Sequence, residues 1–234
     1  MPSILKVEDL VSYIGLYTIL QGVSVDVEEG DIVTILGRNG AGKTTLLKTI
    51  LGMVSVRSGK LEFKGQSIAG KPPYEIARMG VGYVPEDYGI FDALTIQENL
   101  RLPMREANQE SWGRVEYVLD LFPDLKAAYK RPARSLSGGQ RQMLSVGRAM
   151  VNDNQIILID EPSKGLAPII IEKMGLAFIE IAKTRTILLV EQNFALACAV
   201  AKRYYIVNEG RTVRNGLVKD LLLDTETQKQ YLGI

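Results

Sequence analysis

The segment at residues 37–44 constrains the fold of this chain more than any other. It reads GRNGAGKT, which fits the pattern G-x-x-x-x-G-K-[ST]. The apolar run at 32–36 before it predicts a buried strand, and the spacing of residues 44–51 after it predicts a helix that ends at Gly52. Such a turn points successive backbone N–H groups inward, next to the positive end of the helix. The sequence therefore predicts a polyphosphate-binding loop inside a strand-loop-helix unit.

The chemistry of this loop favours ATP with Mg²⁺. Lys43 supplies a positive charge for the β and γ phosphates, and the Thr44 hydroxyl is placed to ligate Mg²⁺. A glycine-rich turn without a ligand is the alternative. The residues assigned to nucleotide binding are Gly37, Arg38, Asn39, Gly40, Ala41, Gly42, Lys43, Thr44 and Thr45.

A second candidate site follows the apolar run at 156–159. The run ends in two adjacent carboxylates, Asp160 and Glu161. Ligands of open α/β sheets bind at the carboxyl ends of the strands, so this position suits a metal site. We expect Asp160 to hold Mg²⁺ and Glu161 to act as the catalytic base or orienter of the attacking water. Without the phosphate loop, a solvated acidic turn would be the simpler interpretation.

Composition excludes several classes of chemistry. The 234 residues include no histidine, which excludes imidazole catalysis and histidine-ligated metals. The 28 basic and 27 acidic residues nearly balance, so the net charge does not indicate nucleic acid as a partner. The lone Cys198 cannot form an intrachain disulfide, and no apolar stretch approaches a membrane span. A soluble, intracellular protein is expected.

The order of predicted elements indicates an α/β fold with two additions. Short strands at 4–7, 20–27 and 60–64 predict an antiparallel β-subdomain, and a strand is expected at 81–84. Helices at 95–102 and 111–122 predict a helical insert, broken by prolines. Strand-helix alternation then resumes, with a strand at 186–190, helices at 168–183 and 194–202, and a hairpin turning at 208–210. We expect one domain over 1–234, built from a nucleotide-binding core with β-subdomain (1–86), a helical subdomain (87–150) and the continued core (151–234).

Residues 136–140 read LSGGQ, and Ser137 is a suitable N-cap for the helix that follows. From the residues alone, this is a helix cap or an anion-binding helix N-terminus. With the phosphate loop before it and the acidic strand end after it, the whole chain resembles the ATP-binding cassette (ABC) ATPases, whose signature is LSGGQ. The resemblance implies a P-loop NTPase core in a head-to-tail pair, where Ser137, Gly138, Gly139 and Gln140 of one cassette contact ATP held by the other.

Four positions depart from the general cassette pattern. Glu86 stands at the usual metal- and water-contacting glutamine, and we assign it to the metal site. Ala167 stands where most cassettes have an aspartate, and Gln192 replaces the switch histidine and is assigned to catalysis. The adenine-stacking aromatic falls on Ile14, beside Tyr13, which we assign to adenine.

The subfamily follows from Pro85-Glu86, G-L-A-P at 165–168, V-E-Q-N at 190–193 and the ending at 231–233. These resemble the shorter ATP-binding subunit of branched-chain amino acid importers, although Lys164 replaces the usual leucine. The implied partners are membrane permeases, a second cassette and, indirectly, a periplasmic or extracellular solute-binding protein. For the second cassette a heterodimer is favoured and a homodimer is possible. The chain itself would lie at the cytoplasmic face of the membrane. Nucleic acid is not an expected partner. The alternatives are a urea or short-amide importer, a non-transport cassette acting on nucleic acid, a regulatory cassette that binds ATP without hydrolysing it, and a P-loop kinase or GTPase.

Overall fold

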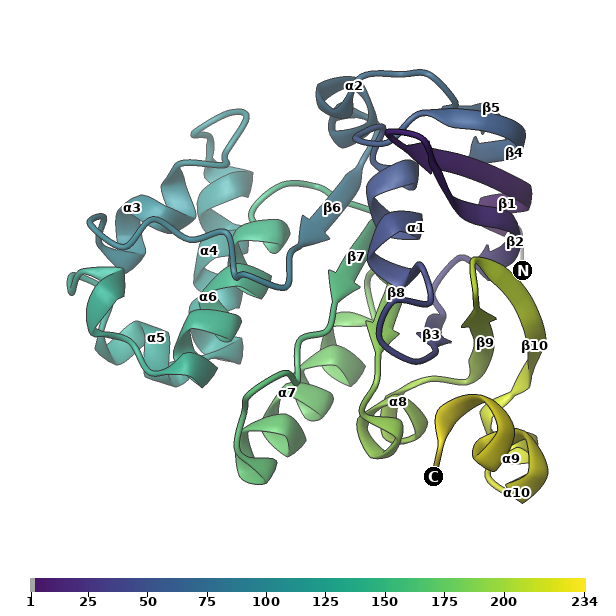
Figure 1. Ribbon diagram of the computed structural model, residues 1–234. Helices are drawn as coiled ribbons and strands as arrows, with labels where there is room; N and C mark the ends of the chain where they lie inside the picture. Colours follow the sequence, from purple (N-terminus) through teal and green to yellow (C-terminus); the bar gives the residue numbers. More distant parts are fainter. Residues whose placement is uncertain (1–2) are drawn as a thin grey trace.

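The computed structural model describes residues 3–234 and contains two sheets (Figure 1). The strands are β1 (Ser3–Ile14), β2 (Tyr17–Glu28), β3 (Ile32–Leu36), β4 (Val56–Phe63), β5 (Gln66–Ser67), β6 (Val81–Val84), β7 (Ile156–Asp160), β8 (Thr186–Glu191), β9 (Arg203–Asn208) and β10 (Arg211–Leu217). The helices are α1 (Lys43–Ile50), α2 (Pro73–Arg78), α3 (Ile96–Arg101), α4 (Gln109–Leu121), α5 (Pro123–Ala127), α6 (Gly138–Met150), α7 (Pro168–Ile181), α8 (Phe194–Val200), α9 (Val218–Leu221) and α10 (Thr225–Thr227). The predicted α/β class is confirmed.

The larger sheet brings the ends of distant strands to one edge. Its order is β10-β9-β3-β8-β7-β6, with parallel pairing from β9 to β6 and antiparallel pairing only between β10 and β9. Leu36 pairs with Glu191, and Asp160 pairs with Val190. Strands β3, β7 and β8 are buried along their whole length, as their apolar runs predict. The segments that follow them therefore leave the sheet side by side.

The smaller sheet is antiparallel, in the order β2-β1-β4-β5. Its first hairpin is longer than predicted, because β1 continues to Ile14 and β2 begins at Tyr17, with Gly15 in the turn. Strand β2 passes through Gly22, which has φ +117. Shifts in the pairing register absorb such irregularities without ending the strand.

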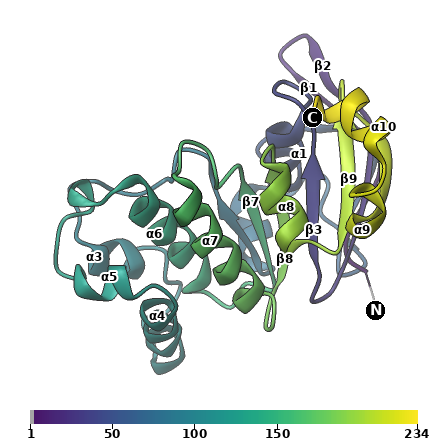
Figure 2. The ribbon, with the colours of Figure 1, turned by 90° about the horizontal axis from the view of Figure 1, so that it is seen from below.

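Helix α1 lies between the two sheets (Figure 2). Its Leu46, Leu47 and Ile50 are fully buried. They pack in one apolar cluster with residues of both sheets, including Leu20 of β2 and Val190 of β8. The helix that begins at the phosphate loop is therefore held on two sides by the core.

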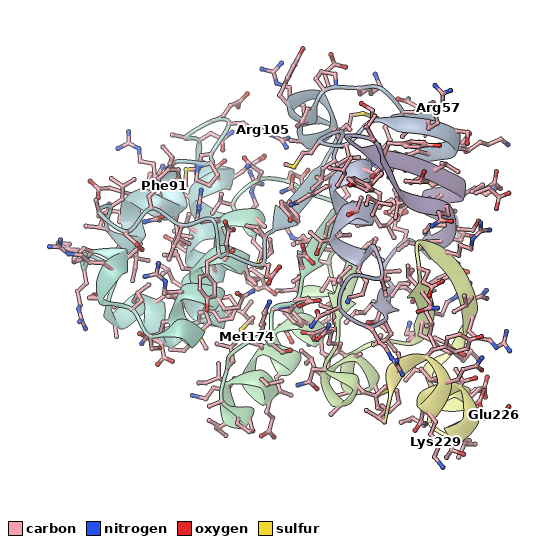
Figure 3. All side chains as sticks on the ribbon, in the orientation of Figure 1. Arg57, Phe91, Arg105, Met174, Glu226 and Lys229 are labelled. Atoms are coloured by element: carbon pink, nitrogen blue, oxygen red, sulfur yellow. The ribbon has the colours of Figure 1, made fainter. Side chains whose placement is uncertain are left out.

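Helices α3 to α6 form a separate block beside the core, as predicted from the insert (Figure 1). Thr95 caps α3 in a capping box with Glu98. Pro123, expected only to break a helix, occupies the first turn of the unpredicted α5, where a proline is favourable. Arg105, labelled in Figure 3, ties the block to the core by donating hydrogen bonds to the Ala77 carbonyl and to Asn154.

Within residues 3–234, no helix has the length and apolar character needed to cross a membrane.

The predicted hairpin turn at 208–210 anchors the phosphate loop. Glu209 and Gly210 both have positive φ, as a two-residue turn between β9 and β10 requires. The Gly210 N–H donates to the Ala41 carbonyl of the loop at 2.9 Å, and its carbonyl accepts from the Gln21 N–H at 2.7 Å. A Cβ at position 210 would lie 2.0 Å from the Ile19 carbonyl oxygen. Only glycine fits here.

We expect Gly210→Ala to lower the free energy of unfolding by at least about 2 kcal/mol more than Gly30→Ala. Both glycines have left-handed φ, at +72 and +80, so both variants carry the same backbone penalty. A Cβ at Gly30 meets nothing within 4 Å, so only Gly210→Ala adds a clash. Urea unfolding of the two variants checks this, and equal losses would contradict it.

Candidate functional site

The phosphate loop leads from β3 into α1 as predicted. Gly42 is the N-cap of α1, with φ +104, and as a glycine it has no side chain to accept the first N–H groups of the helix. Ser137, the N-cap of α6, does accept such a bond through its hydroxyl. The start of α1 therefore presents uncapped donors and the positive end of the helix dipole to an anion.

Lys43 is the first residue of α1, and its buried side chain folds back over the loop. Its Nζ donates to the carbonyls of Gly37 at 2.9 Å and Arg38 at 3.1 Å, and it pairs with Glu161 at 3.2 Å. Glu161 has a left-handed φ of +45, which is unusual for this residue type. The strained backbone directs the carboxylate toward the phosphate loop, so the two predicted catalytic side chains lie together.

Asp160 and Thr44 also meet. The Thr44 hydroxyl donates to Asp160 at 3.0 Å, and the Tyr83 hydroxyl lies 3.4 Å from the other carboxylate oxygen. Asp160 is fully buried, and burial raises its pKa above the ordinary value of 3.8. The charges of Glu161 and Glu86 raise the pKa further, while the bonds from Thr44 and Tyr83 oppose the shift.

The donors at this point fit Mg²⁺. Thr44 and Asp160 offer hard oxygen ligands, and Mg²⁺ typically uses one or two such protein groups together with phosphate oxygens and water. Among residues 3–234 no three carboxylate, cysteine or histidine side chains are grouped as a metal cluster. The metal would therefore take its other ligands from the nucleotide and from water.

Glu86 lines the same cavity as Thr44 and Asp160. This cavity measures about 470 Å³, and its other lining residues are Lys48, Tyr83, Pro85 and Asp87. The Glu86 carboxylate forms an ion pair with Lys164, from the segment between β7 and α7. The structure therefore brings Glu86 to the site, with its charge engaged by a lysine.

Glu191, at the end of β8, is a buried carboxylate to which the sequence assigned no role. Its carboxylate accepts hydrogen bonds from the Ser163 hydroxyl at 2.9 Å and from the N–H groups of Ser163 at 3.0 Å, Gln192 at 3.0 Å and Asn193 at 2.9 Å. Burial raises its pKa, and these four bonds oppose the shift. Glu191 thus fixes the loop that follows Glu161 against the loop that carries Gln192. Glu191 is part of the motif V-E-Q-N, but this role could not be predicted from the motif, because its partner Ser163 lies 28 residues away in sequence.

Gln192 reaches the phosphate loop directly. Its Nε2 donates to the Asn39 side-chain oxygen. Gln192, which the sequence assigns to catalysis, therefore links the end of β8 to the phosphate loop after β3.

The predicted adenine residue Tyr13 lies near the tip of the β1–β2 hairpin. Ser12 faces inward, where its hydroxyl lies 3.4 Å from that of Thr49 in α1. The pairing register shifts between Ser12 and Tyr13, and beyond the shift Tyr13, Ile14 and Tyr17 are all exposed. Ile14 pairs with Tyr17 across the hairpin. The tip therefore carries two exposed tyrosines, Tyr13 beside Ile14 and Tyr17 opposite it.

The signature residues lie apart from the phosphate loop. Ser137 and Gln140 form a capping box at the start of α6. Gly138 lies against Leu166 and Tyr88, and a Cβ at Gly139 would meet Ile170 at 2.6 Å. These neighbours belong to the loop after β6 and to the segment that begins α7. Ser137 and Gly138 are exposed, and so are available to a second molecule.

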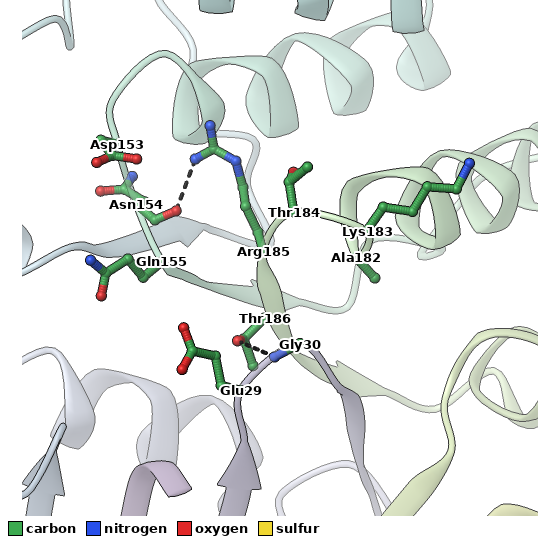
Figure 4. Close-up of a pocket in the computed structure, with 10 residues that line it drawn as sticks. All are labelled: Glu29, Gly30, Asp153, Asn154, Gln155, Ala182, Lys183, Thr184, Arg185 and Thr186. Atoms are coloured by element: carbon green, nitrogen blue, oxygen red, sulfur yellow. Dashed lines mark hydrogen bonds between the residues drawn. The ribbon is translucent and has the colours of Figure 1, made fainter. Parts of the chain in front are cut away.

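A second cavity, of about 360 Å³, lies at the opposite edge of the sheet, where β7 and β8 begin (Figure 4). Its central Arg185 donates to the carbonyls of Asn152 at 3.0 Å and Asn154 at 2.9 Å. The Thr186 hydroxyl accepts the Gly30 N–H at 3.0 Å. These groups are used in holding loops together, and strand starts are not where α/β sheets bind ligands.

We expect Asp160→Asn to raise the melting temperature of the metal-free protein at pH 7 by a few degrees. The raised pKa means that the ionised carboxylate costs folding free energy at neutral pH. The same shift favours folding below the ordinary pKa, so the advantage of the variant shrinks as the pH falls toward 3.8.

Thermal melts in EDTA from pH 4 to pH 8 check this expectation. Asp153→Asn, which changes an exposed carboxylate near Arg185, is the control and should leave the melting temperature unchanged. A lower melting temperature for Asp160→Asn than for the wild type at pH 7 would contradict the expectation.

Comparison with known proteins agrees with this geometry. The family model described as "ABC transporter" matches residues 20–164. The chain is 38% identical, over 98% of its length and 99% of the relative's, to the "High-affinity branched-chain amino acid transport ATP-binding protein BraG" of Pseudomonas aeruginosa. It is 37% identical, over 92% of its length and 93% of the relative's, to the "Probable branched-chain amino acid transport ATP-binding protein LivF" of Archaeoglobus fulgidus.

A solved structure shares the whole architecture. The ADP conformation of an ATP-binding cassette of an ABC transporter superposes with a TM-score of 0.84, at 27% identity, covering 97% of each chain. A nucleotide-free ATP-binding cassette gives a TM-score of 0.83 at 26% identity, covering 96% of this chain and 97% of that one. Family model, relatives and fold agree: the chain belongs to the ATP-binding cassette family of ABC transporters.

Proposed function

We propose that this protein is the ATP-hydrolysing subunit of an importer for branched-chain or other hydrophobic amino acids. One observation carries the ATPase part: the phosphate loop, Asp160 and Glu161 meet at one edge of the parallel sheet, joined through Lys43 and Thr44. The names of the relatives support the amino acid part.

In this proposal each residue has a distinct task. The N–H groups of the phosphate loop and Lys43 bind the β and γ phosphates, so Lys43 exchanges its contact with Glu161 for phosphate oxygens. Thr44 and Asp160 would hold Mg²⁺, which would supply positive charge to the phosphates. Glu161, released from Lys43, orients the attacking water and accepts its proton. Gln192 holds the γ-phosphate or the water through its neutral amide.

The site is completed by a second cassette. Residues 137–140 of one molecule would cover the phosphates bound by the other, which accounts for the exposure of Ser137 and Gly138. A heterodimer is favoured over a homodimer by resemblance to importers with two ATPase subunits. An isolated chain binds ATP in this proposal and hydrolyses it slowly.

The helical block transmits the motion to the permeases. A cleft of about 350 Å³ lies between the block and the core, lined by residues of both, including Tyr83, Arg105 and Arg148. We place the contact with a permease helix in this cleft, at the cytoplasmic face of the membrane. The parts that move relative to one another would be residues 1–86, 87–150 and 151–234. The solute would contact the permeases and a solute-binding protein, and never this chain.

Hydrolysis is tested with Glu161→Gln. We expect this variant to bind ATP as tightly as the wild type and to lose at least about 100-fold in turnover, because the amide cannot accept a proton. Turnover is measured by phosphate release in vesicles with the partner subunits, and affinity by titration of the chain alone. Normal turnover would contradict the role of Glu161, and a wild type without turnover would favour a regulatory cassette.

The adenine contact is tested with a matched pair of variants. Because Tyr17 is exposed and pairs with Ile14, the position on which the stacking aromatic falls, we expect Tyr17→Ala to weaken ATP binding about tenfold through loss of stacking. Tyr13→Ala should change ATP affinity less than twofold, although our sequence analysis assigned Tyr13 to adenine. Equilibrium titration with ATP checks both variants, and the reverse order would make Tyr13 the stacking residue.

A further inference from the structure

The nucleotide site is crowded with negative charge. Asp160, Glu86 and Asp87 line one cavity, and Glu161 follows Asp160 directly. A bound nucleoside triphosphate adds several more negative charges at the same place. Like charges in a partly buried site repel each other, so the carboxylates need partners if the phosphates are to bind.

Three of these carboxylates, Glu161, Asp160 and Glu86, each have a different partner. Glu161 pairs with Lys43, and Asp160 is hydrogen-bonded by the neutral Thr44 and Tyr83. Glu86 pairs with Lys164 at 2.5 Å. When Lys43 moves to the phosphates, Lys164 stays paired with Glu86, and Lys48 also lines the cavity.

The position of Lys164 suits this task. It lies three residues after Glu161, and its N–H donates to the Glu161 carbonyl at 3.2 Å. The residue before it, Ser163, donates hydrogen bonds to the Glu191 carboxylate through its N–H and its hydroxyl. The Lys164 backbone is therefore fixed, while its side chain is 61% exposed and reaches across to the loop after β6. The pKa of Lys164 is raised, first by Glu86 and then by Glu161 and Asp160, so its ammonium lies in the field of all three.

We propose that Lys164 is a positioning residue of the nucleotide site, which holds the Glu86 carboxylate and offsets its repulsion of bound phosphates. This rests on the proposed function, because it presumes that ATP occupies the site. It also gives a role to the departure at Lys164: the chain resembles the subfamily in Pro85-Glu86 and adds a positive charge beside Glu86 where the subfamily has leucine.

The test measures ATP affinity without metal and without turnover. ATP is titrated in EDTA into the wild type, Lys164→Met, Glu86→Gln and the double variant, and binding is followed by calorimetry. Methionine keeps the length of the stem and removes the charge. The matched control is Lys183→Met, because the Lys183–Glu180 pair has nearly the same length, 2.6 Å, and exposure, 65% and 44% against 61% and 41%. Lys183 lies at the opposite edge of the sheet (Figure 4).

We expect Lys164→Met to weaken ATP binding about threefold when Glu86 is present, the scale of an exposed ion pair. In the Glu86→Gln background, Lys164→Met should change nothing, because the charge it offsets is gone. Lys183→Met should bind ATP like the wild type, and all variants should melt within a degree or two of it.

Two outcomes would overturn the proposal. Equal weakening by Lys164→Met in both backgrounds would mean that Lys164 attracts the phosphates itself. No weakening in either background would mean that the ion pair is unconnected to the nucleotide. If the wild type bound no ATP with or without Mg²⁺, the proposed function itself would fail, which separates the two failures.

Discussion

The parallel register of β3, β7 and β8 is the constraint on which the rest of the site depends. Leu36 stands opposite Glu191, and Asp160 opposite Val190, so the three strands end level with one another. The phosphate loop, the Glu161 loop and the Gln192 loop therefore start from one edge, although the phosphate loop is more than a hundred residues from the other two in sequence. Because these strands are fully buried, a slip of register would bury the wrong side chains. The geometry of the site is thus stabilised by the apolar core rather than by the polar groups that use it.

Polar contacts then set the loops relative to one another. Glu191 joins the loops after β7 and β8, Gln192 joins the latter to Asn39, and Gly210 holds Ala41 from the far side. These contacts have a cost, visible in the left-handed Glu161 and in the raised pKa of the buried Asp160. A strained backbone at Glu161 and a buried carboxylate at Asp160 thus stand next to each other where a nucleotide and a metal would bind, as is common in functional sites.

How much could be predicted from the sequence depended on whether the information was local. The strand-loop-helix unit, the acidic strand end and the Ser137 cap each lie within a few residues, and the structure has all three where expected. The length of the first hairpin was missed, because register shifts near Asp9 and Gly22 leave no simple alternation. Helix α5 was missed because Pro123 was interpreted only as a breaker. The pair of Glu86 with Lys164 spans 78 residues, so no local pattern announces it. Both residues were noticed as departures, and only the structure joins them.

The absence of histidine has a physical consequence at position 192, where glutamine stands in place of the family's switch histidine. A histidine there would change charge near its ordinary pKa of about 6.5, and its contact with the phosphate loop would change with it. The Gln192 amide donates to Asn39 in one charge state at every pH, so this contact has no titration of its own. The groups that do change charge are carboxylates, and Asp160 has its pKa raised by burial and by its acidic neighbours. Sensitivity to acid in this site therefore belongs to Asp160 and to Glu191, whose pKa burial also raises, whereas the contact between the Gln192 and Asn39 side chains has no titrating group.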